Sequence, residues 1–160
     1  VLSLCVSIWL ASLLLPAPEG GSVEYAFGEW DWFALNRDAW YNVFATLCWP
    51  NRGALGRRLH AAPPAQVARA GALPCEEMFE LEVARAKAGA LQKRLEESFQ
   101  RGIETRVHNP LLGLDLVHAD VDYCFLVNCN HVLGRWLREL GCELGGTATF
   151  SRFRVERAVE

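Results

Sequence analysis

The chain has 160 residues, 51% of them hydrophobic, and a formal net charge of −3. This length and composition suffice for a sizeable core, so we expect one domain over residues 1–160. The basic residues are scattered along the chain and do not form a stripe interleaved with aromatic residues, which argues against nucleic acid as a partner.

The six cysteines give no sign of a metal centre or a redox dithiol. They are Cys5, Cys48, Cys75, Cys124, Cys129 and Cys142. They form no C-x-x-C pair, and no histidine stands at zinc-finger spacing from them. We therefore expect no bound metal and no cofactor.

The N-terminal residues 1–15 carry no charge and end at a Pro-Ala-Pro-Glu-Gly-Gly segment. They are shorter than a membrane-spanning helix requires. One interpretation is the apolar part of a signal or anchor, which places the protein in the cell envelope, in the periplasm or at a membrane, although the preceding positive residues are missing. The other is a buried strand over residues 5–15, because Trp9 and leucines 13–15 suit a strand covered on both faces. We favour the strand.

Residues 23–32 predict a second strand that runs into a tight turn, where Gly28 allows an unusual backbone angle. Residues 38–48 predict a helix with Asp38 as its N-cap. About half of the aromatic residues of the chain fall in and between these two segments. They either fill the core or line a groove or docking face, and we expect surface contacts from Trp30, Trp32 and Trp49.

The middle of the chain contains three segments that differ in composition and in the spacing of their apolar residues. Residues 51–74 are rich in Arg, Ala, Gly and Pro, which predicts a surface excursion with at most a short helix at 54–59. Residues 78–83 alternate apolar and acidic residues, which is typical of a half-exposed strand. Over residues 84–101 the apolar residues recur at helical spacing, which predicts an amphipathic helix.

The last part of the chain begins with residues 107–122, which contain Pro110 and Gly113 and predict an irregular segment. Residues 123–127 form an apolar run that predicts a strand, and residues 148–155 alternate as a final strand does. Together these elements predict an α+β domain, a mostly antiparallel sheet with helices packed on it.

The most informative stretch is Asn-Cys-Asn-His at residues 128–131, between the apolar run and an amphipathic helix over 132–140. Asn128 is a natural N-cap, which puts Cys129 in the first turn of that helix. Unpaired N–H groups at a helix N-terminus lower the pKa of a thiol and favour the nucleophilic thiolate. The alternative for Cys129, as for Cys124, is a small buried hydrophobic residue.

This stretch resembles the Asn-Cys-Glu-His segment of the lecithin:retinol acyltransferase-like group. More broadly it is similar to the circularly permuted papain-like thiol hydrolases, in which a histidine strand comes first and the cysteine helix last, and to a small bacterial branch of that superfamily. The matching stretches are residues 9–16, 26–32, 49–50 and 128–130. Their shared order covers nearly the whole chain, and it implies a permuted papain-like fold.

The resemblance implies acyl transfer on an amide or ester, with Cys129 as the nucleophile and Glu24 where the family has a third polar residue. The family histidine has no counterpart, because residues 7–12 contain no titratable group. His131 points roughly 200° away from Cys129 around the helix. His108 and His118 both lie in the segment before the motif, which can fold back toward the cysteine, and we take His118 as the candidate base.

Two functions follow from these expectations. One is a papain-like thiol hydrolase or acyltransferase-type domain that has lost much of its catalysis, because general-base help contributes about a hundredfold to ten-thousandfold. The other is a non-enzymatic accessory or structural subunit of a membrane or envelope assembly. In that role the apolar N-terminus and the Trp-rich segment contact a protein or membrane-surface partner.

Overall fold

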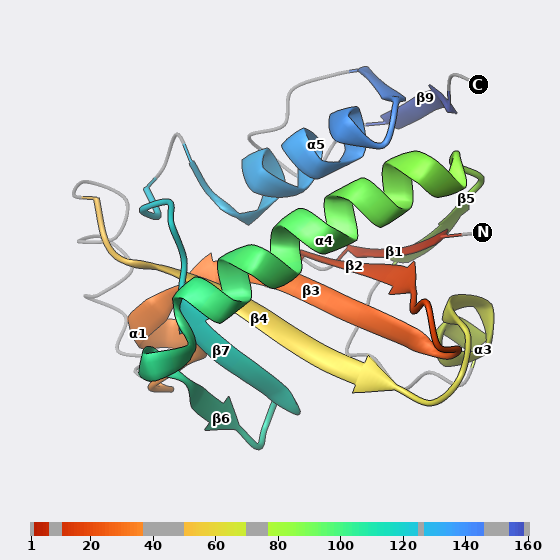
Figure 1. The fold of residues 1–160 in the computed structure, drawn as a ribbon. Coiled ribbons are helices and arrows are strands. Elements are labelled where there is room, and N and C mark those ends of the chain that lie inside the picture. Colours follow the sequence, from red (N-terminus) through yellow and green to blue (C-terminus); the bar gives the residue numbers. More distant parts are fainter. Residues whose placement is uncertain are drawn as a thin grey trace.

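The computed structural model describes residues 2–6, 11–36, 50–69, 77–124, 127–145 and 154–158. These residues form a seven-stranded antiparallel sheet in the order β5-β1-β2-β3-β4-β7-β6, with helices α4 and α5 lying across one face (Figure 1). The predicted α+β class with a mostly antiparallel sheet is confirmed. The strands are β1 (Leu2–Val6), β2 (Ala11–Pro16), β3 (Ser22–Glu29), β4 (Gly53–His60), β5 (Glu77–Leu81), β6 (Val107–Asn109) and β7 (Leu114–His118). The helices are α1 (Trp30–Phe33), α3 (Pro64–Arg69), α4 (Arg85–Arg101) and α5 (Cys129–Glu139), with a 3-10 turn η1 (Ile103–Thr105) after α4.

The apolar N-terminal stretch forms two strands, where a single strand over residues 5–15 was expected. β1 and β2 pair antiparallel with Ser3 opposite Leu14. Leucines 13–15 in β2 are completely buried. A strand covered on both faces is apolar throughout, so its sequence does not show where a turn interrupts it. Residues 7–10, including Trp9, lie outside the described residues.

The predicted strand over 23–32 forms as β3 but ends earlier, at Glu29, where the chain turns into α1. Glu29 caps this short helix, because its Oε2 accepts a hydrogen bond from the Trp32 N–H at 2.7 Å. Gly28 is needed for packing, since a Cβ there would overlap the Phe33 ring. The helix predicted over 38–48 and Trp49 lie outside the described residues.

The surface excursion predicted over residues 51–74 is wrong for its described part, residues 51–69. β4 and α3 occupy this segment, and the first half of β4 is buried. β4 pairs with β3 on one side and β7 on the other, with Leu55 opposite Phe27 and Val117. Gly, Ala and Arg have little intrinsic strand preference, so pairing on both edges overrides local propensity here. Arg57 and Arg58 of β4 form ion pairs with Glu96 and Glu24, respectively.

Residues 107–122, expected to be irregular, contain the β6–β7 hairpin. Pro110 and Gly113 lie in its turn, where Gly113 has a φ of +65°. The strand expected over 123–127 is not a ladder strand in the described residues, which show only the isolated bridges Asn51–Tyr123 and Cys124–Val127. Of the last strand, expected at 148–155, residues 148–153 lie outside the described residues. Residues 154 and 155 belong to β9 (Arg154–Ala158), which pairs with β8 (Cys142–Gly145).

The two long helices match their predictions. α4 buries Ala88, Leu91, Leu95 and Phe99, and Gly102 follows its last residue. In α5 the Asn128 side chain caps the first turn by accepting the His131 N–H at 3.1 Å. Its buried apolar face consists of Val132, Leu133, Trp136 and Leu137.

Side-chain alternation along the central strands divides the interior into two clusters. The larger lies between the sheet and helices α4 and α5, and it includes Val23, Tyr25 and Phe27 of β3. The smaller lies on the opposite face and includes Ala26 of β3 and Leu116 of β7. This division decides which candidate side chains can meet, because neighbouring residues of one strand point to opposite faces. Among the described residues, no helix is both long enough and apolar enough to cross a bilayer.

Candidate functional site

Cys129 lies where the sequence predicts it, at the first position of α5. The helix packs over β2 and β3, and Cys129 is 6% exposed within the larger core cluster, together with Tyr25, Phe27 and Val132. The first-turn N–H groups of a helix favour a thiolate. The side chain is nevertheless part of the core, which the alternative interpretation of a buried hydrophobic residue requires.

The phenol of Tyr123 lies next to the Cys129 thiol. Burial raises the pKa of Tyr123 above its usual range. The adjacent Cys129 side chain raises it further through its charge and a hydrogen bond, and so does the charge of the Glu29 carboxylate. The ring of Tyr123 stacks on Phe27 with 6.0 Å between centroids. A phenol with a raised pKa keeps its proton at neutral pH, so it can donate a hydrogen bond to sulfur but cannot take the thiol proton.

Glu24 lies on the other face of the sheet from Cys129. It alternates with Val23 and Tyr25, which face the α5 side, and it is 1% exposed. Its Oε2 accepts hydrogen bonds from Arg58 Nε at 2.9 Å and, when His60 donates, from His60 Nε2 at 3.1 Å. Burial alone would raise the pKa of Glu24, but the hydrogen bond from His60 and the charge and hydrogen bond of Arg58 outweigh it and lower that pKa. The structure therefore pairs Glu24 with β4 and not with the cysteine.

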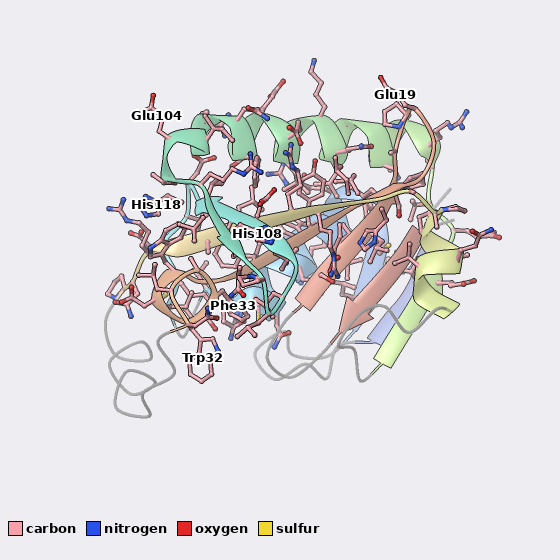
Figure 2. The ribbon with its side chains drawn as sticks, turned by 90° about the horizontal axis from the view of Figure 1, so that it is seen from below. Glu19, Trp32, Phe33, Glu104, His108 and His118 are labelled. Atoms are coloured by element: carbon pink, nitrogen blue, oxygen red, sulfur yellow. The ribbon has the colours of Figure 1, made fainter. Side chains whose placement is uncertain are left out.

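His118, the candidate base, lies at the end of β7 and extends outward from the sheet (Figure 2). Its Nδ1 is 3.2 Å from Arg52 Nη1, and its ring meets Trp30 edge-on at 4.2 Å. Arginine can only donate, so Nδ1 must be the acceptor, and the ring is neutral with its proton on Nε2. Burial, followed by the charge of Arg52, lowers the pKa of His118 below its usual value of 6.5.

The other three histidines of the chain also contact other groups. His60 binds Glu24, as described above. The Nδ1 of His108 lies 2.9 Å from Asp115 Oδ1, in the β6–β7 hairpin. The Nδ1 of His131 lies 2.9 Å from Asn128 Oδ1, at the cap of α5. The described ring contacts of all four histidines are thus with groups other than the Cys129 thiol.

Three residues of these sites were not found by sequence reasoning. Tyr123 is brought to Cys129 by its bridge with Asn51, where Tyr123 N–H donates to the Asn51 carbonyl at 2.7 Å. Arg58 and His60 meet Glu24 only because β3 and β4 pair with Glu24 opposite Arg58. No local motif signals either contact, although an acidic residue inside an otherwise apolar strand does require a buried cationic partner.

One hollow beside α5 is lined by described residues, and it is small. A hollow of about 180 Å³ lies between α4 and α5, lined partly by Phe27 and Val132. The ion pair between Arg94 and Glu139, with hydrogen bonds of 3.0 and 2.9 Å, joins the two helices at its edge. Pockets for small molecules usually measure about 300–1,000 Å³, so this hollow is below the usual size.

Within the described ranges, no group of three or more His, Cys, Asp or Glu side chains is arranged to hold a metal ion. Comparison of the chain with family models, with curated proteins and with solved structures finds no match. The functional assignment therefore depends on the geometry and on the sequence resemblance.

Proposed function

We propose that this chain is a permuted papain-like, thiol-hydrolase-type domain that keeps the cysteine at the head of its last helix but has lost turnover on amides and esters. In this proposal it serves as a binding or structural unit of a larger assembly. Cys129 then acts as a core residue at a position that active relatives use for the nucleophile.

The order of the elements supports the family part of this proposal. The antiparallel sheet precedes the cysteine helix in the chain, and α5 packs on β2 and β3 with Cys129 at its N-terminal end. Permuted thiol hydrolases have the same order, with the cysteine helix last. A helix N-terminus is one of the positions at which a thiol nucleophile can be activated by a lowered pKa.

The observation that carries the loss of turnover is the engagement of all four histidines with other groups. His60 contacts Glu24, His108 contacts Asp115, His118 contacts Arg52, and His131 contacts Asn128. Tyr123, which does contact the thiol, remains protonated at neutral pH. Without a base, a thiol hydrolase forfeits about a hundredfold to ten-thousandfold in rate.

The test compares hydrolysis of p-nitrophenyl esters and a peptide p-nitroanilide by the wild-type chain and by Cys129→Ser. The matched control is Cys142→Ser, which changes another buried thiol, on β8. We expect the three proteins to show the same background rate and no acyl adduct by intact mass spectrometry. An acyl group on Cys129, with turnover lost in Cys129→Ser and kept in Cys142→Ser, would overturn the proposal.

A second candidate function is that of an accessory subunit that contacts a membrane surface. Leucines 13–15 are completely buried by the protein itself, so this part of the N-terminal apolar run is used inside the fold. The Trp-rich segment is the remaining candidate contact, and Figure 2 shows Trp32 extending from α1 away from the sheet. Tryptophan favours the interface between water and lipid.

Co-sedimentation with phosphatidylcholine vesicles tests this second candidate. We expect the wild-type chain to sediment with vesicles and Trp32→Ser to do so several-fold less. Leu59→Ser is the control, because Leu59 is an exposed leucine, at 71%, and pairs with Val23 at the end of the β3–β4 pair that is distant from α1. Equal sedimentation of wild type and Trp32→Ser, or none by either, would remove the membrane role.

A further inference from the structure

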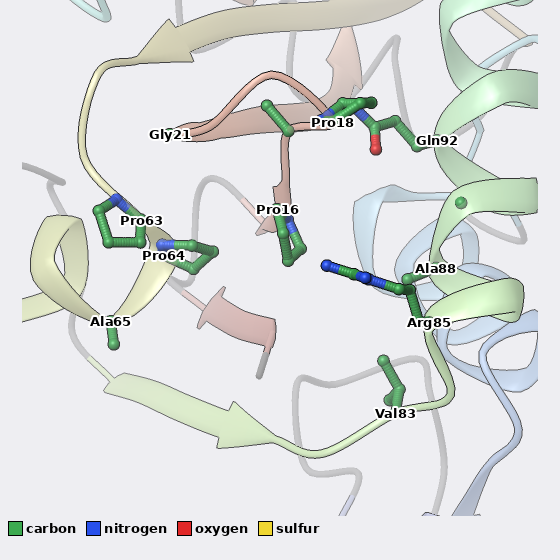
Figure 3. A pocket seen from close by; sticks show the side chains of 12 residues that line it. Pro16, Pro18, Gly21, Pro63, Pro64, Ala65, Val83, Arg85, Ala88 and Gln92 are labelled. Atoms are coloured by element: carbon green, nitrogen blue, oxygen red, sulfur yellow. The ribbon is translucent and has the colours of Figure 1, made fainter.

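A second cavity, of about 690 Å³, lies between the β2–β3 turn, the start of α3 and the first turns of α4 (Figure 3). Its volume is within the usual range for small-molecule sites. It lies away from Cys129. The Lys87 side chain packs against Gly141, so the start of α4, which lines the cavity, lies beside the C-terminal end of α5. Cys129 is at the opposite end of α5, whose eleven residues span about 16 Å.

The walls of this cavity are held in place before any ligand binds. The β2–β3 turn is closed by hydrogen bonds from Ala17 N–H to the Gly21 carbonyl and from Gly20 N–H to the Ala17 carbonyl, both at 3.2 Å. Ser22 Oγ donates to the Ala62 carbonyl at 2.8 Å, which fastens this turn to the segment before α3. Four prolines then give rigid aliphatic walls, namely Pro16, Pro18, Pro63 and Pro64.

Among the described residues that line the cavity, one has a charged side chain. Arg85, from the first turn of α4, extends into the space toward Pro16 (Figure 3). No acidic residue is among the twelve that line the cavity. Within the described part of the chain, the Arg85 side chain makes no ion pair or hydrogen bond. Of the twelve described lining residues, Gln92 is the only other one whose side chain has a polar group.

We propose that this cavity binds a small amphiphilic carboxylate, with its aliphatic part against the prolines and Ala88 and its carboxylate on Arg85. A guanidinium matches a carboxylate with two parallel hydrogen bonds. A single arginine suits one negative charge better than the several charges of a polyphosphate. The described lining residues include no aromatic ring on which a nucleobase or sugar would stack.

The test measures octanoate binding to the full chain by protein-detected NMR titration, with octan-1-ol and octylammonium as probes of equal length. We expect octanoate to bind with a Kd of about 1 mM or below, and the two other probes to bind at least several-fold more weakly. Arg85→Ala should weaken octanoate binding about tenfold to a hundredfold, because a hydrogen bond to a charged partner is lost. Lys93→Ala, which removes an exposed cation from the same helix, should leave the affinity unchanged.

Gly89 provides an independent variant that fills the cavity. It lines the space, and a Cβ built on it meets no atom within 4 Å, so a larger side chain fits without disturbing the helix. Gly89→Phe should abolish octanoate binding while circular dichroism remains that of the wild type, and Gly89→Ala should keep it. No octanoate binding by the wild type, equal binding of octan-1-ol, or binding unchanged in both Arg85→Ala and Gly89→Phe would overturn the proposal.

Discussion

Arg58 binds Glu24 across the β3–β4 pair, with its Nε and Nη2 at 2.9 and 2.8 Å from the same carboxylate oxygen. The carboxylate is 1% exposed and the arginine 21%, so this ion pair lies almost entirely inside the protein. His60 contacts the same oxygen at 3.1 Å, from the end of β4. A charge buried in this way is stable only while its partners are present. The cluster therefore couples the pairing of β3 and β4 to the ionisation of one carboxyl.

Glu24→Gln should lower the free energy of unfolding at pH 7 by about 3 kcal/mol, because it leaves the Arg58 charge without its buried partner. It should also change the acid dependence of stability. The pKa of Glu24 is lower in the folded protein than its ordinary value of 4.5, despite burial, because His60 and Arg58 favour the carboxylate. Its stabilising contribution is thus complete above that value and is lost as the pH falls through the folded pKa.

Urea denaturation between pH 3 and pH 7 measures both effects, and the wild type should lose more stability over this range than Glu24→Gln. Glu104→Gln is the control, because Glu104 is an exposed carboxyl on η1 and should leave the profile unchanged. Parallel pH profiles for wild type and Glu24→Gln would contradict the role given to the buried carboxylate.

Arg52→Ala should raise the pKa of His118. Burial and then the charge of Arg52 lower this pKa below 6.5, so removal of the guanidinium relieves the second cause and leaves the first. The folded protein favours the neutral ring, and stability should therefore decline as the pH falls below 6.5. NMR titration of the His118 Hε1 signal checks the shift, with Arg138→Ala as a control on an exposed arginine of α5. A lower or unchanged pKa in Arg52→Ala would refute the assigned contact.

The two long helices, α4 and α5, were predictable because their signals are local. The period of Ala88, Leu91, Leu95 and Phe99 locates α4, and Asn128 locates the start of α5. The strands that sequence reasoning missed, β4 and the β6–β7 hairpin, have glycine, arginine or turn residues where strand formers are expected. Their strand conformation comes from neighbours far along the chain, and local composition does not contain that information.

The same difference between local signals and long-range contacts applies to the candidate site. The position of Cys129 follows from a helix start, which is local. The partners of Glu24 do not, because Arg58 and His60 stand 34 and 36 residues later and meet it only through strand register. The face on which each side chain lies depends on that register, so Glu24 and Cys129 are on opposite faces although both were expected in one site.

Asn128→Ala should destabilise the protein by about 1 kcal/mol, because the first turn of α5 loses the acceptor for the His131 N–H. Asn128→Ser is the matched control, since a serine hydroxyl also caps helices, and it should restore most of the loss. Thermal unfolding followed by circular dichroism gives both values. Equal stability of the alanine and serine variants would show that the cap contributes little.

Gly53→Ala should be the most damaging small substitution near Cys129. A Cβ at this position would lie 2.1 Å from the Val121 carbonyl oxygen, which belongs to the backbone and cannot turn aside. The segment after β7 would have to move away from β4, where Ala119 N–H now donates to the Gly53 carbonyl at 2.8 Å. That segment carries Tyr123 to the thiol. We expect a loss of about 1–3 kcal/mol in stability and faster alkylation of Cys129 by iodoacetamide, measured by peptide mass spectrometry.

Gly89→Ala, in the open first half of α4, should instead raise stability by up to about 1 kcal/mol and leave Cys129 labelling unchanged. If Gly53→Ala labels Cys129 no faster than the wild type, the packing of Tyr123 does not protect the thiol.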